Sequence, residues 1–362
     1  MITVLLGTRA QLIKMAPVIL ELENRGWHPQ LIMTGQHKET MGQLLSDFGI
    51  HTPPLSLYDG PEVTSIRRVI PWFLRCLWRL WKDSRRLFPK AGASRGIVLV
   101  HGDTFSTLLG ALAAKMTGQK VGHVESGLRS FRLFHPFPEE LTRLAVFRLT
   151  DFAFCPDDWS RSNLDGYRVN AINTQGNTLI DALRLALKIA KPLPAVPPAG
   201  PFGVVSLHRF ENIFKRERLV AILELIEEAA RRYPLVFVLH PATRHNLEKF
   251  GLHERISANP RFQLWPRMGY FEFVTLLTRS AFVITDGGSN QEELSYLDKP
   301  TLLMREATER QEGLGRNAVL SGYDFDKVRA FVDGLKCPEK IAISLPEGSP
   351  SAFVADALAA YS

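Results

Sequence analysis

Three acidic residues stand in the loops of one central stretch of the chain, from Val100 to Glu140. Asp103 and Glu125 each come just after a short apolar run that is typical of a strand, and Glu139 follows in the next loop. Because ligands bind at the carboxyl edge of an open parallel sheet, the first two acids are predicted to face a ligand there. Like charges and desolvation both disfavour ionised carboxylates, so three acids in one dry site predict proton transfer.

Each of these acids also has a purely structural interpretation. Asp103 would cap the helix that follows it, Glu125 would hold its loop through backbone N–H groups, and Glu139 would be a first-turn acid of a helix. A metal site is not predicted, because the chain lacks the H-x-x-x-H or H-x-H spacing of metal-binding histidines.

Groups that bind anions stand at other strand ends. Gly7-Thr8-Arg9 offers backbone N–H groups and a guanidinium at a strand-to-helix turn, and Asp286-Gly287-Gly288-Ser289-Asn290 is a similar small-residue turn. The later half of the chain adds, at its strand ends, His208, Arg209, His240 and Arg310. Carboxylates in one half and anion-binding groups in the other predict a diphosphate-linked substrate. The dinucleotide fingerprint G-x-G-x-x-G is absent, which disfavours a Rossmann dehydrogenase.

Short apolar runs alternate with helical segments along the chain, and the alternation restarts after the proline-rich connector from Lys191 to Pro201. Two doubly wound α/β halves are the simplest architecture for this pattern. The acids and the anion-binding groups are then expected to share an interdomain cleft. The final segment, Ser349 to Tyr361, has helical periodicity.

The net charge of +7 is concentrated in one segment. Seven basic side chains and a single acid lie between residues 67 and 86, whereas the rest of the chain is nearly neutral. No aromatic and basic RNA-binding signature accompanies them, so no nucleic-acid partner is predicted. A helix is expected from Pro71 to Phe88, with large apolar residues on one half and basic residues on the other. Its apolar face would pack on the core or a partner subunit, or the helix would make peripheral contact with an anionic membrane.

Three cysteines, Cys76, Cys155 and Cys337, lie far apart without metal-ligand spacing, which is typical of reduced thiols in a cytoplasmic protein. The sequence begins with a strand rather than a signal peptide, and its apolar runs are too short to span a membrane. A cytoplasmic location is therefore predicted, on the inner face of the membrane if the basic helix docks there.

The chain carries, in order and over nearly its whole length, the motifs GTRAQLIKMAPV, TGQH, VHGDT, GHVESGLR, HPFPEE, GNTLIDAL, LHRFEN, TDGGSNQEE and TERQEG. Together they resemble the UDP-N-acetylglucosamine 2-epimerase family. The resemblance implies the GT-B fold, in which two Rossmann-like domains face an interdomain cleft and the C-terminal helix returns to the first domain. It implies an N-terminal domain of residues 1–168 plus 350–362 and a UDP-binding C-terminal domain of residues 169–349.

The resemblance also implies a reaction and its residues. The reaction is inversion at C2 of UDP-GlcNAc to give UDP-ManNAc, by elimination of UDP to a 2-acetamidoglucal and re-addition, without a cofactor, for bacterial surface polysaccharide synthesis. The implied catalytic residues are Asp103, Glu125, Glu139 and His208. The implied UDP-binding residues are Arg9, Lys14, Gly288, Ser289, Glu293 and Arg310. In non-hydrolysing members an activating site for a second UDP-GlcNAc would involve Gln36, His37 and His240, and a homodimer is expected.

The chain departs from the family pattern at three places. The usual G-T-R-P-E reads Gly7-Thr8-Arg9-Ala10-Gln11, the usual D-S-G-G-I-Q-E-E reads D-G-G-S-N-Q-E-E from Asp286, and the Trp- and Arg-rich helix is not typical of the family. The alternative prediction is a GT-B glycosyltransferase that uses a UDP-sugar and a lipid-linked acceptor at the membrane surface, which the basic helix favours. A hydrolysing relative that releases free ManNAc is disfavoured by the TGQH loop.

Overall fold

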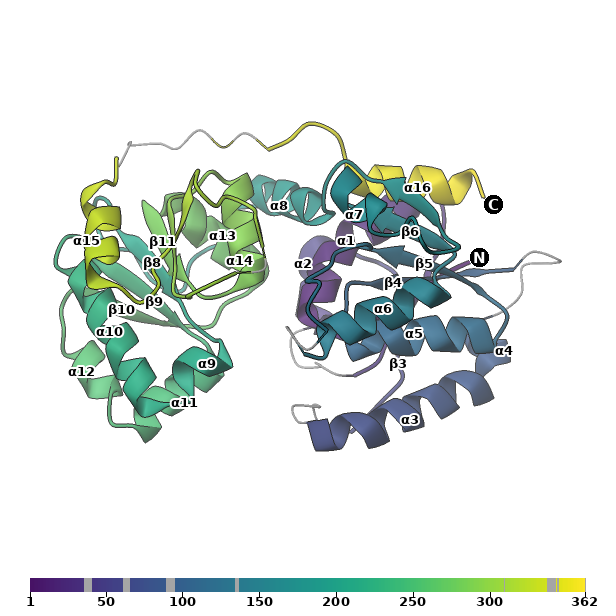
Figure 1. Cartoon of the computed structure of the whole chain (residues 1–362), viewed down its shortest axis with the longest axis horizontal. Helices are drawn as coiled ribbons and strands as arrows, with labels where there is room; N and C mark the ends of the chain where they lie inside the picture. The colour runs from purple at the N-terminus through teal and green to yellow at the C-terminus, as the bar shows by residue number, and fades with distance from the viewer. Residues whose placement is uncertain are drawn as a thin grey trace. The chain divides into compact units, whose positions relative to one another are not determined.

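The computed structural model describes residues 1–35, 41–60, 66–88, 95–133, 137–308, 310–336, 343 and 345–361. The chain divides into two compact units, of which the first comprises Met1–Ala182 and Glu347–Ser362 and the second Leu183–Pro346. Each unit contains a parallel β-sheet with its own helices (Figure 1). The predicted α/β class with two doubly wound halves is confirmed, whereas the domain boundaries at 168/169 and 349/350 stay predictions.

In the first unit, the described strands pair in the order β3-β2-β1-β4-β5-β6-β7, and every neighbouring pair is parallel. The strands are β1 (Ile2–Leu6), β2 (Gln30–Met33), β3 (Pro54–Ser56), β4 (Ile97–His101), β5 (Lys120–Val124), β6 (Phe152–Cys155) and β7 (Asn170–Asn173). The helices are α1 (Arg9–Asn24), α2 (Met41–Phe48), α3 (Ile66–Lys82), α4 (Ser84–Leu87), α5 (Phe105–Met116), α6 (Glu139–Leu149), α7 (Asp158–Ser162) and α16 (Pro350–Ala359). Successive strand side chains point to opposite faces, and every residue of β1 and β4 is buried, so both faces of the sheet centre are covered.

The helix α8 (Leu179–Lys188) carries the chain from the first unit into the second. There the described strands pair in the order β10-β9-β8-β11-β12-β13, again all parallel. These strands are β8 (Gly203–Ser206), β9 (Leu235–Leu239), β10 (Phe262–Pro266), β11 (Phe282–Thr285), β12 (Thr301–Leu303) and β13 (Ala318–Leu320). The helices are α9 (Phe210–Ile213), α10 (Arg216–Ala230), α11 (Pro241–Lys249), α12 (His253–Ser257), α13 (Tyr270–Arg279), α14 (Gly288–Tyr296) and α15 (Phe325–Asp333). The chain then returns to the first unit, where α16 lies along α1 (Figure 1).

The strand order brings the predicted site loops together within each unit. In the first unit β4 lies between β1 and β5, so the loops that carry Arg9, Asp103 and Glu125 leave three adjacent strands at the same edge. In the second unit β8 pairs with β11, which places the loops of His208 and Asp286 side by side. Parallel pairing alone therefore explains how residues far apart in sequence meet.

The Trp- and Arg-rich segment folds differently from the prediction. Instead of one helix from Pro71 to Phe88, α3 begins at Ile66, contains Pro71 and ends at Lys82, and α4 follows. Its apolar residues do not form one buried face, because Trp72, Cys76 and Leu80 pack in the core while another set is exposed. That exposed set consists of Ile70, Leu74, Trp78 and Trp81.

A second difference from what the sequence suggests concerns Pro53 and Pro54, because a pair of prolines is typical of a loop. This segment contains the edge strand β3, which pairs with β2 from Pro54 to Ser56. A proline is tolerated at the first residue of an edge strand because no neighbour needs its missing N–H group. The proline pair therefore hid a strand from sequence reasoning.

Candidate active site

Glu125 is held by side chains from other elements of the first unit. Lys14 of α1 forms an ion pair with Glu125 Oε1, and Asn177 Nδ2, from the loop between β7 and α8, donates to the same oxygen at 2.6 Å. His101 Nε2, at the end of β4, lies 3.5 Å from Glu125 Oε2. The Lys14 and Glu125 side chains are only 5% and 9% exposed, so the pair is nearly removed from water.

Two buried histidines stand behind this carboxylate. Burial lowers the pKa of His101 to about 3, although the neighbouring Glu125 favours its protonated form. Burial also lowers the pKa of His123 to about 4. His123 Nε2 lies 2.7 Å from the carbonyl oxygen of Gly102, which can only accept, so Nε2 carries the proton and Nδ1 accepts from the Ser126 hydroxyl at 2.9 Å. Both rings are therefore neutral near pH 7.

Asp103 belongs to a second charged cluster of the first unit. Arg143 of α6 donates from Nη2 to Asp103 Oδ2 at 2.6 Å and from Nη1 to Glu140 Oε2 at 3.3 Å. Glu140 is fully buried and also accepts from Arg129 Nε at 2.6 Å and from the Ser130 N–H at 3.0 Å. Burial alone would raise the pKa of Glu140, but these donors hold it below the ordinary value. Arg143 thus links an acid at the sheet edge to a buried carboxylate beneath it.

The structural interpretations of the acids are decided separately. Asp103 does not cap α5, because Thr104 is the capping residue and its hydroxyl accepts from the Thr107 N–H group. The described partners of Glu125 include side chains of two distant elements, so it does more than hold its own loop. Glu139 is the first residue of α6, which agrees with the first-turn interpretation.

Gln11 stands where the family's usual G-T-R-P-E pattern has Glu, and its side-chain amide both accepts and donates hydrogen bonds. Its Oε1 accepts the N–H groups of Gly7 at 2.9 Å and Thr8 at 3.1 Å, and its Nε2 donates to the His101 carbonyl at 2.7 Å and to Thr104 Oγ1 at 3.0 Å. The amide therefore joins the turn before Arg9 to the loop that carries Asp103. Arg9 itself begins α1 and is half-buried.

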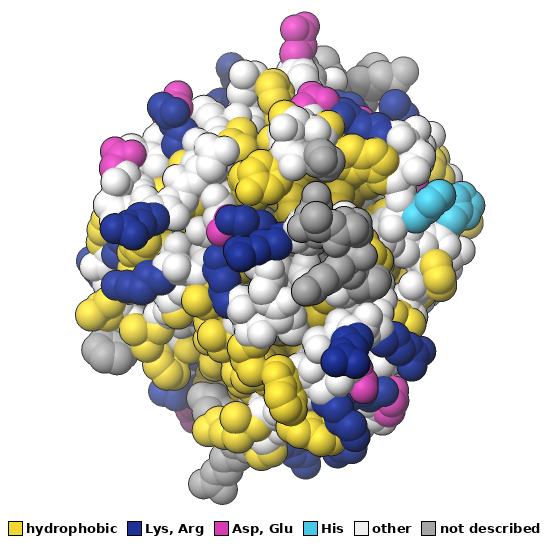
Figure 2. Space-filling model, turned by 90° about the vertical axis from the view of Figure 1, so that its right-hand side faces the viewer, with side chains coloured by type: hydrophobic (Ala, Val, Ile, Leu, Met, Phe, Trp, Pro, Cys, Tyr) yellow, Lys and Arg dark blue, Asp and Glu magenta, His cyan; other side chains and the backbone are white. Residues whose placement is uncertain are grey.

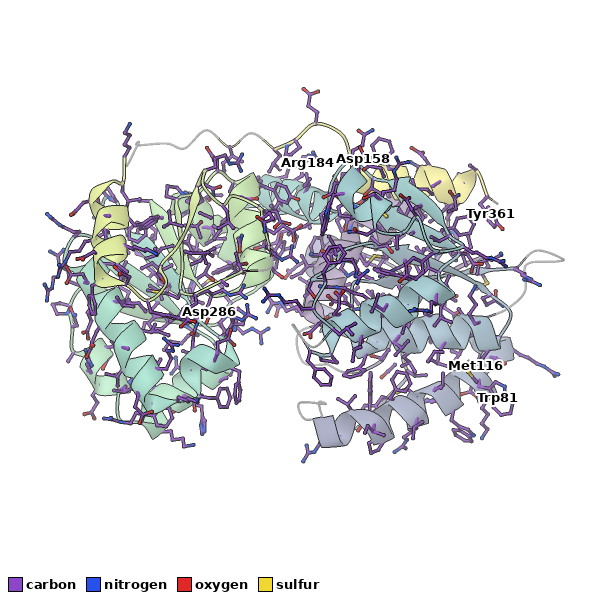
Figure 3. The ribbon with its side chains drawn as sticks, viewed as in Figure 1. Trp81, Met116, Asp158, Arg184, Asp286 and Tyr361 are labelled. Atoms are coloured by element: carbon purple, nitrogen blue, oxygen red, sulfur yellow. The ribbon has the colours of Figure 1, made fainter. Side chains whose placement is uncertain are left out.

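His208 and Asp286 meet at the edge of the second sheet. Asp286 is fully buried and accepts the backbone N–H groups of His208 and Arg209, each at 3.0 Å, and the Asn212 side-chain amide at 3.0 Å. His208 Nδ1 lies 3.4 Å from Asp286 Oδ1, so the carboxylate can orient the imidazole. Figure 3 labels Asp286 in the second unit. A Cβ atom on Gly287 would come within 2.8 Å of His208 Cε1, so this glycine leaves room for the ring.

The predicted phosphate turn forms the start of α14. Gly287 caps this helix, Gly288 is half-buried and Ser289 is exposed, so the N–H end of the helix reaches the surface. Glu293 is buried one turn further along the helix. Arg310 Nη1 donates to the buried Glu292 Oε2 at 2.6 Å. A helix N-terminus of this kind favours an anion.

Of the three residues of the predicted activating site, the structure describes His240 alone. His240 stacks on His208 with 4.8 Å between ring centroids, so it lies against a predicted catalytic residue. Gln36 and His37 lie outside the described residues.

Sequence reasoning missed Asn177, His101 and Arg143 as members of these clusters. Asn177 offered a signal, because it follows β7 at the same sheet edge as the acids and stands in the GNTLIDAL motif. His101 offered another, as the polar last residue of a strand that is otherwise apolar. Arg143 offered none, since a basic residue on a helix is usually solvated.

Comparison with known proteins places this geometry in a family. The protein-family model described as UDP-N-acetylglucosamine 2-epimerase matches residues 20–339 of the chain. A UDP-N-acetylglucosamine 2-epimerase of Methanococcus maripaludis is 32% identical over 356 residues, covering 94% of this chain and 91% of the relative. One of Bacillus subtilis is 32% identical over 331 residues, covering 89% of this chain and 83% of the relative.

Solved structures agree with the sequence relatives. The UDP-GlcNAc 2-epimerase of Neisseria meningitidis bound to UDP-GlcNAc superimposes with a TM-score of 0.80 at 28% identity, covering 99% of each chain. The glycotransferase of kitacinnamycin is 14% identical with a TM-score of 0.56, covering 92% of this chain and 89% of its own, which shows the fold alone. The GT-B fold expected from the motifs is thereby confirmed, and the chain belongs to the UDP-N-acetylglucosamine 2-epimerase family.

Proposed function

We propose that this protein is an isomerase that interconverts UDP-GlcNAc and UDP-ManNAc. The observation that carries the proposal is the buried Glu125 carboxylate paired with Lys14, at the sheet edge from which the Asp103 loop also leaves, in a chain of the epimerase family. Relatives across most of the chain bear this activity in their names, and one solved relative holds UDP-GlcNAc. No redox cofactor is needed for the reaction.

The reaction removes the C2 proton, breaks the C1–O bond to UDP and forms a C1=C2 double bond. UDP then adds back to C1 while a proton is delivered to the opposite face of C2, so atoms and charges balance. The acids Asp103, Glu125 and Glu139 are proposed to move the proton, because a weakly acidic C–H group needs a positioned base. His208 and the start of α14, with Arg9 and Arg310, are proposed to stabilise the departing diphosphate.

The test is incubation with UDP-GlcNAc in deuterated water, with C2 observed by NMR. Deuterium at C2 of both UDP-sugars and formation of UDP-ManNAc are expected. Release of free ManNAc would indicate a hydrolysing enzyme instead. No exchange and no UDP-ManNAc at high enzyme concentration would overturn the proposal. The glycosyltransferase alternative has less support, since the glycotransferase relative shares the fold alone.

A second proposal concerns peripheral contact of α3 with an anionic membrane. Ile70, Leu74, Trp78 and Trp81 recur at helical spacing and are each at least 56% exposed. Figure 2 shows hydrophobic side chains gathered toward the lower part of this side of the molecule, with Lys and Arg side chains beside them. Trp81 lies near the end of α3 (Figure 3). No helix in the described part of the chain is both long and apolar enough to span a membrane.

Charge favours an anionic surface over a second copy of the chain as the occupant. Among the side chains of α3 and α4 that the structure describes, the exposed basic ones are Arg68, Arg75, Lys82, Arg85 and Arg86. Two such helices facing each other would bring like charges together, whereas each basic side chain near anionic lipid contributes about 1 kcal/mol of attraction. Lys82 Nζ stands 4.7 Å from the Trp78 ring, so charge and aromatic surface are adjacent.

Flotation with phosphatidylglycerol vesicles tests this contact. The native chain is expected to float, Trp78→Glu with Trp81→Glu is expected to remain in solution, and Trp159→Glu is the matched control because Trp159 is a similarly exposed tryptophan outside α3. Failure of the native chain to float would overturn the proposal. The homodimer stays a prediction, and light scattering on the same variants would show whether the exposed face of α3 is a subunit interface instead.

A further inference from the structure

Asn177 is a buried residue in the short loop between β7 and α8. Its side-chain oxygen Oδ1 accepts the backbone N–H of Leu179, the first residue of α8, at 3.0 Å. Its side-chain nitrogen Nδ2 donates to Glu125 Oε1 at 2.6 Å. An amide has one acceptor end and one donor end, and here the helix N–H group occupies the acceptor end. The donor end therefore has to face Glu125.

The backbone conformation of Glu125 requires side-chain contacts, such as the hydrogen bond from Asn177, to hold its carboxylate. Glu125 has a φ of 59°, a region that costs free energy for a residue with a side chain and that clusters at functional sites. Its neighbour Gly127 has a φ of 82° and no room for a Cβ, which would lie 2.0 Å from the Ser160 carbonyl oxygen. The loop therefore has an unusual conformation, and the side-chain contacts of Glu125 have to hold its carboxylate in place.

Asn177 directly precedes α8, the helix in which the chain passes from the first unit into the second. One turn after Asn177, Asp181 of α8 accepts from Ser349 Oγ at 3.0 Å and from the Ser351 N–H at 2.8 Å, in the segment that returns to the first unit. Further along α8, Arg184 Nη2 donates to the Pro346 carbonyl oxygen at 2.5 Å. The helix α8, which leaves the first unit, is thus hydrogen-bonded to the segment that returns to this unit.

We propose that Asn177 is a positioning residue that fixes the Glu125 carboxylate for catalysis. Its neutral N–H group holds Oε1 beside Lys14 without adding charge. Other titratable groups around this carboxylate in the described part of the chain include His101 of β4 and His123 of β5, and both are neutral near pH 7. The inference rests on the proposed epimerisation, because it assigns a role to a residue that supports a proposed catalytic acid.

The variant Asn177→Asp separates the two functions of the amide. An aspartate keeps an oxygen for the Leu179 N–H group but places a carboxylate oxygen where the donor to Glu125 was. Two carboxylates this close disfavour double ionisation, so protons bind to the pair at higher pH than to Glu125 alone. We expect kcat to fall at least tenfold, KM to change less than threefold, and the acid limb of the kcat profile to move toward higher pH by about one unit.

Asn173→Asp is the matched control. Asn173 ends β7, its Oδ1 accepts the Gln175 N–H group at 2.7 Å, and it makes no bond to Glu125 in the described structure. The control should keep the native kcat and pH profile. Native kinetics in a folded Asn177→Asp variant would overturn the inference. If this variant does not fold, Asn177→Ser, which keeps a small acceptor, should show the lower kcat with an unchanged KM, and native kcat in it would be equally decisive.

The same experiment distinguishes the two proposals. Absence of C2 exchange in the native protein counts against the proposed function, whereas exchange that is normal in Asn177→Asp counts only against the positioning role. Binding of UDP, measured by calorimetry, should be alike in all variants because the changes avoid the proposed UDP-binding residues.

Discussion

Replacing Lys14 with methionine tests the buried ion pair on which the first-unit site depends. Methionine has nearly the length and volume of the lysine stem, so the packing of α1 against the sheet is conserved. What the change removes is the cation beside Glu125, whose side chain is only 9% exposed. The carboxylate then remains buried with its hydrogen bond from Asn177 but has lost the cation of Lys14.

The magnitude follows from this burial. Breaking a buried ion pair by removing one partner costs about 3 to 5 kcal/mol, because the other charge is left uncompensated. Lys115→Met is the matched control, since Lys115 pairs with Asp151 at 2.6 Å but is 37% exposed. An exposed pair of that kind contributes about 1 kcal/mol or less. The difference between the two variants should therefore be at least about 2 kcal/mol.

Urea unfolding combined with hydrogen exchange of β1 and β5 measures the stability of the first unit by itself, which a two-unit chain requires. Adding Glu125→Gln to Lys14→Met also removes the buried negative charge and should restore much of the lost stability. If the two changes instead add, or if Lys14→Met costs no more than Lys115→Met, the ion pair does not carry the predicted free energy. Deuterium exchange at C2 should be lost in both Lys14 variants.

Three further outcomes are expected. Gly287→Ala would place its Cβ 2.8 Å from the end of the partly exposed His208 ring, so C2 exchange should fall at least tenfold while the unfolding free energy changes by less than about 1 kcal/mol; native activity would contradict the contact. His101 has a native pKa of about 3 against an ordinary value of 6.5, so between these pH values the native state binds fewer protons than the unfolded state. The free energy of unfolding should therefore fall as pH drops through this window. His101→Asn should make the free energy of unfolding less dependent on pH there, measured by unfolding at a series of acid pH values. Glu140 has a lowered pKa, so its contribution is present above the ordinary value of 4.5 and lost as pH falls through the native value; Glu140→Gln should cost about 3 kcal/mol at pH 7 and less at pH 3.

The helix α3 shows where sequence reasoning reached its limit. The spacing of its tryptophans, leucines and arginines predicted an amphipathic helix, and α3 is one. It did not predict that Trp72 and Leu80 would be buried while Trp78 and Trp81 are exposed. The spacing of residues along a helix gives only their angles around the helix axis, and α3 has two apolar faces that lie next to each other. Which of them meets the core depends on how the helix lies on the sheet.

The sequence by itself determined the alternation of strands and helices and the loops in which Asp103, Glu125, His208 and the α14 turn stand. Local physics suffices for these features, because apolar runs, capping residues and small-residue turns act over a few positions. Only the tertiary structure decided the partners: Lys14 and Asn177 at Glu125, Arg143 at Asp103, and Asp286 at His208. These partners come from elements remote in sequence, and their ionic and hydrogen-bonding contacts exist only after the parallel strands have paired.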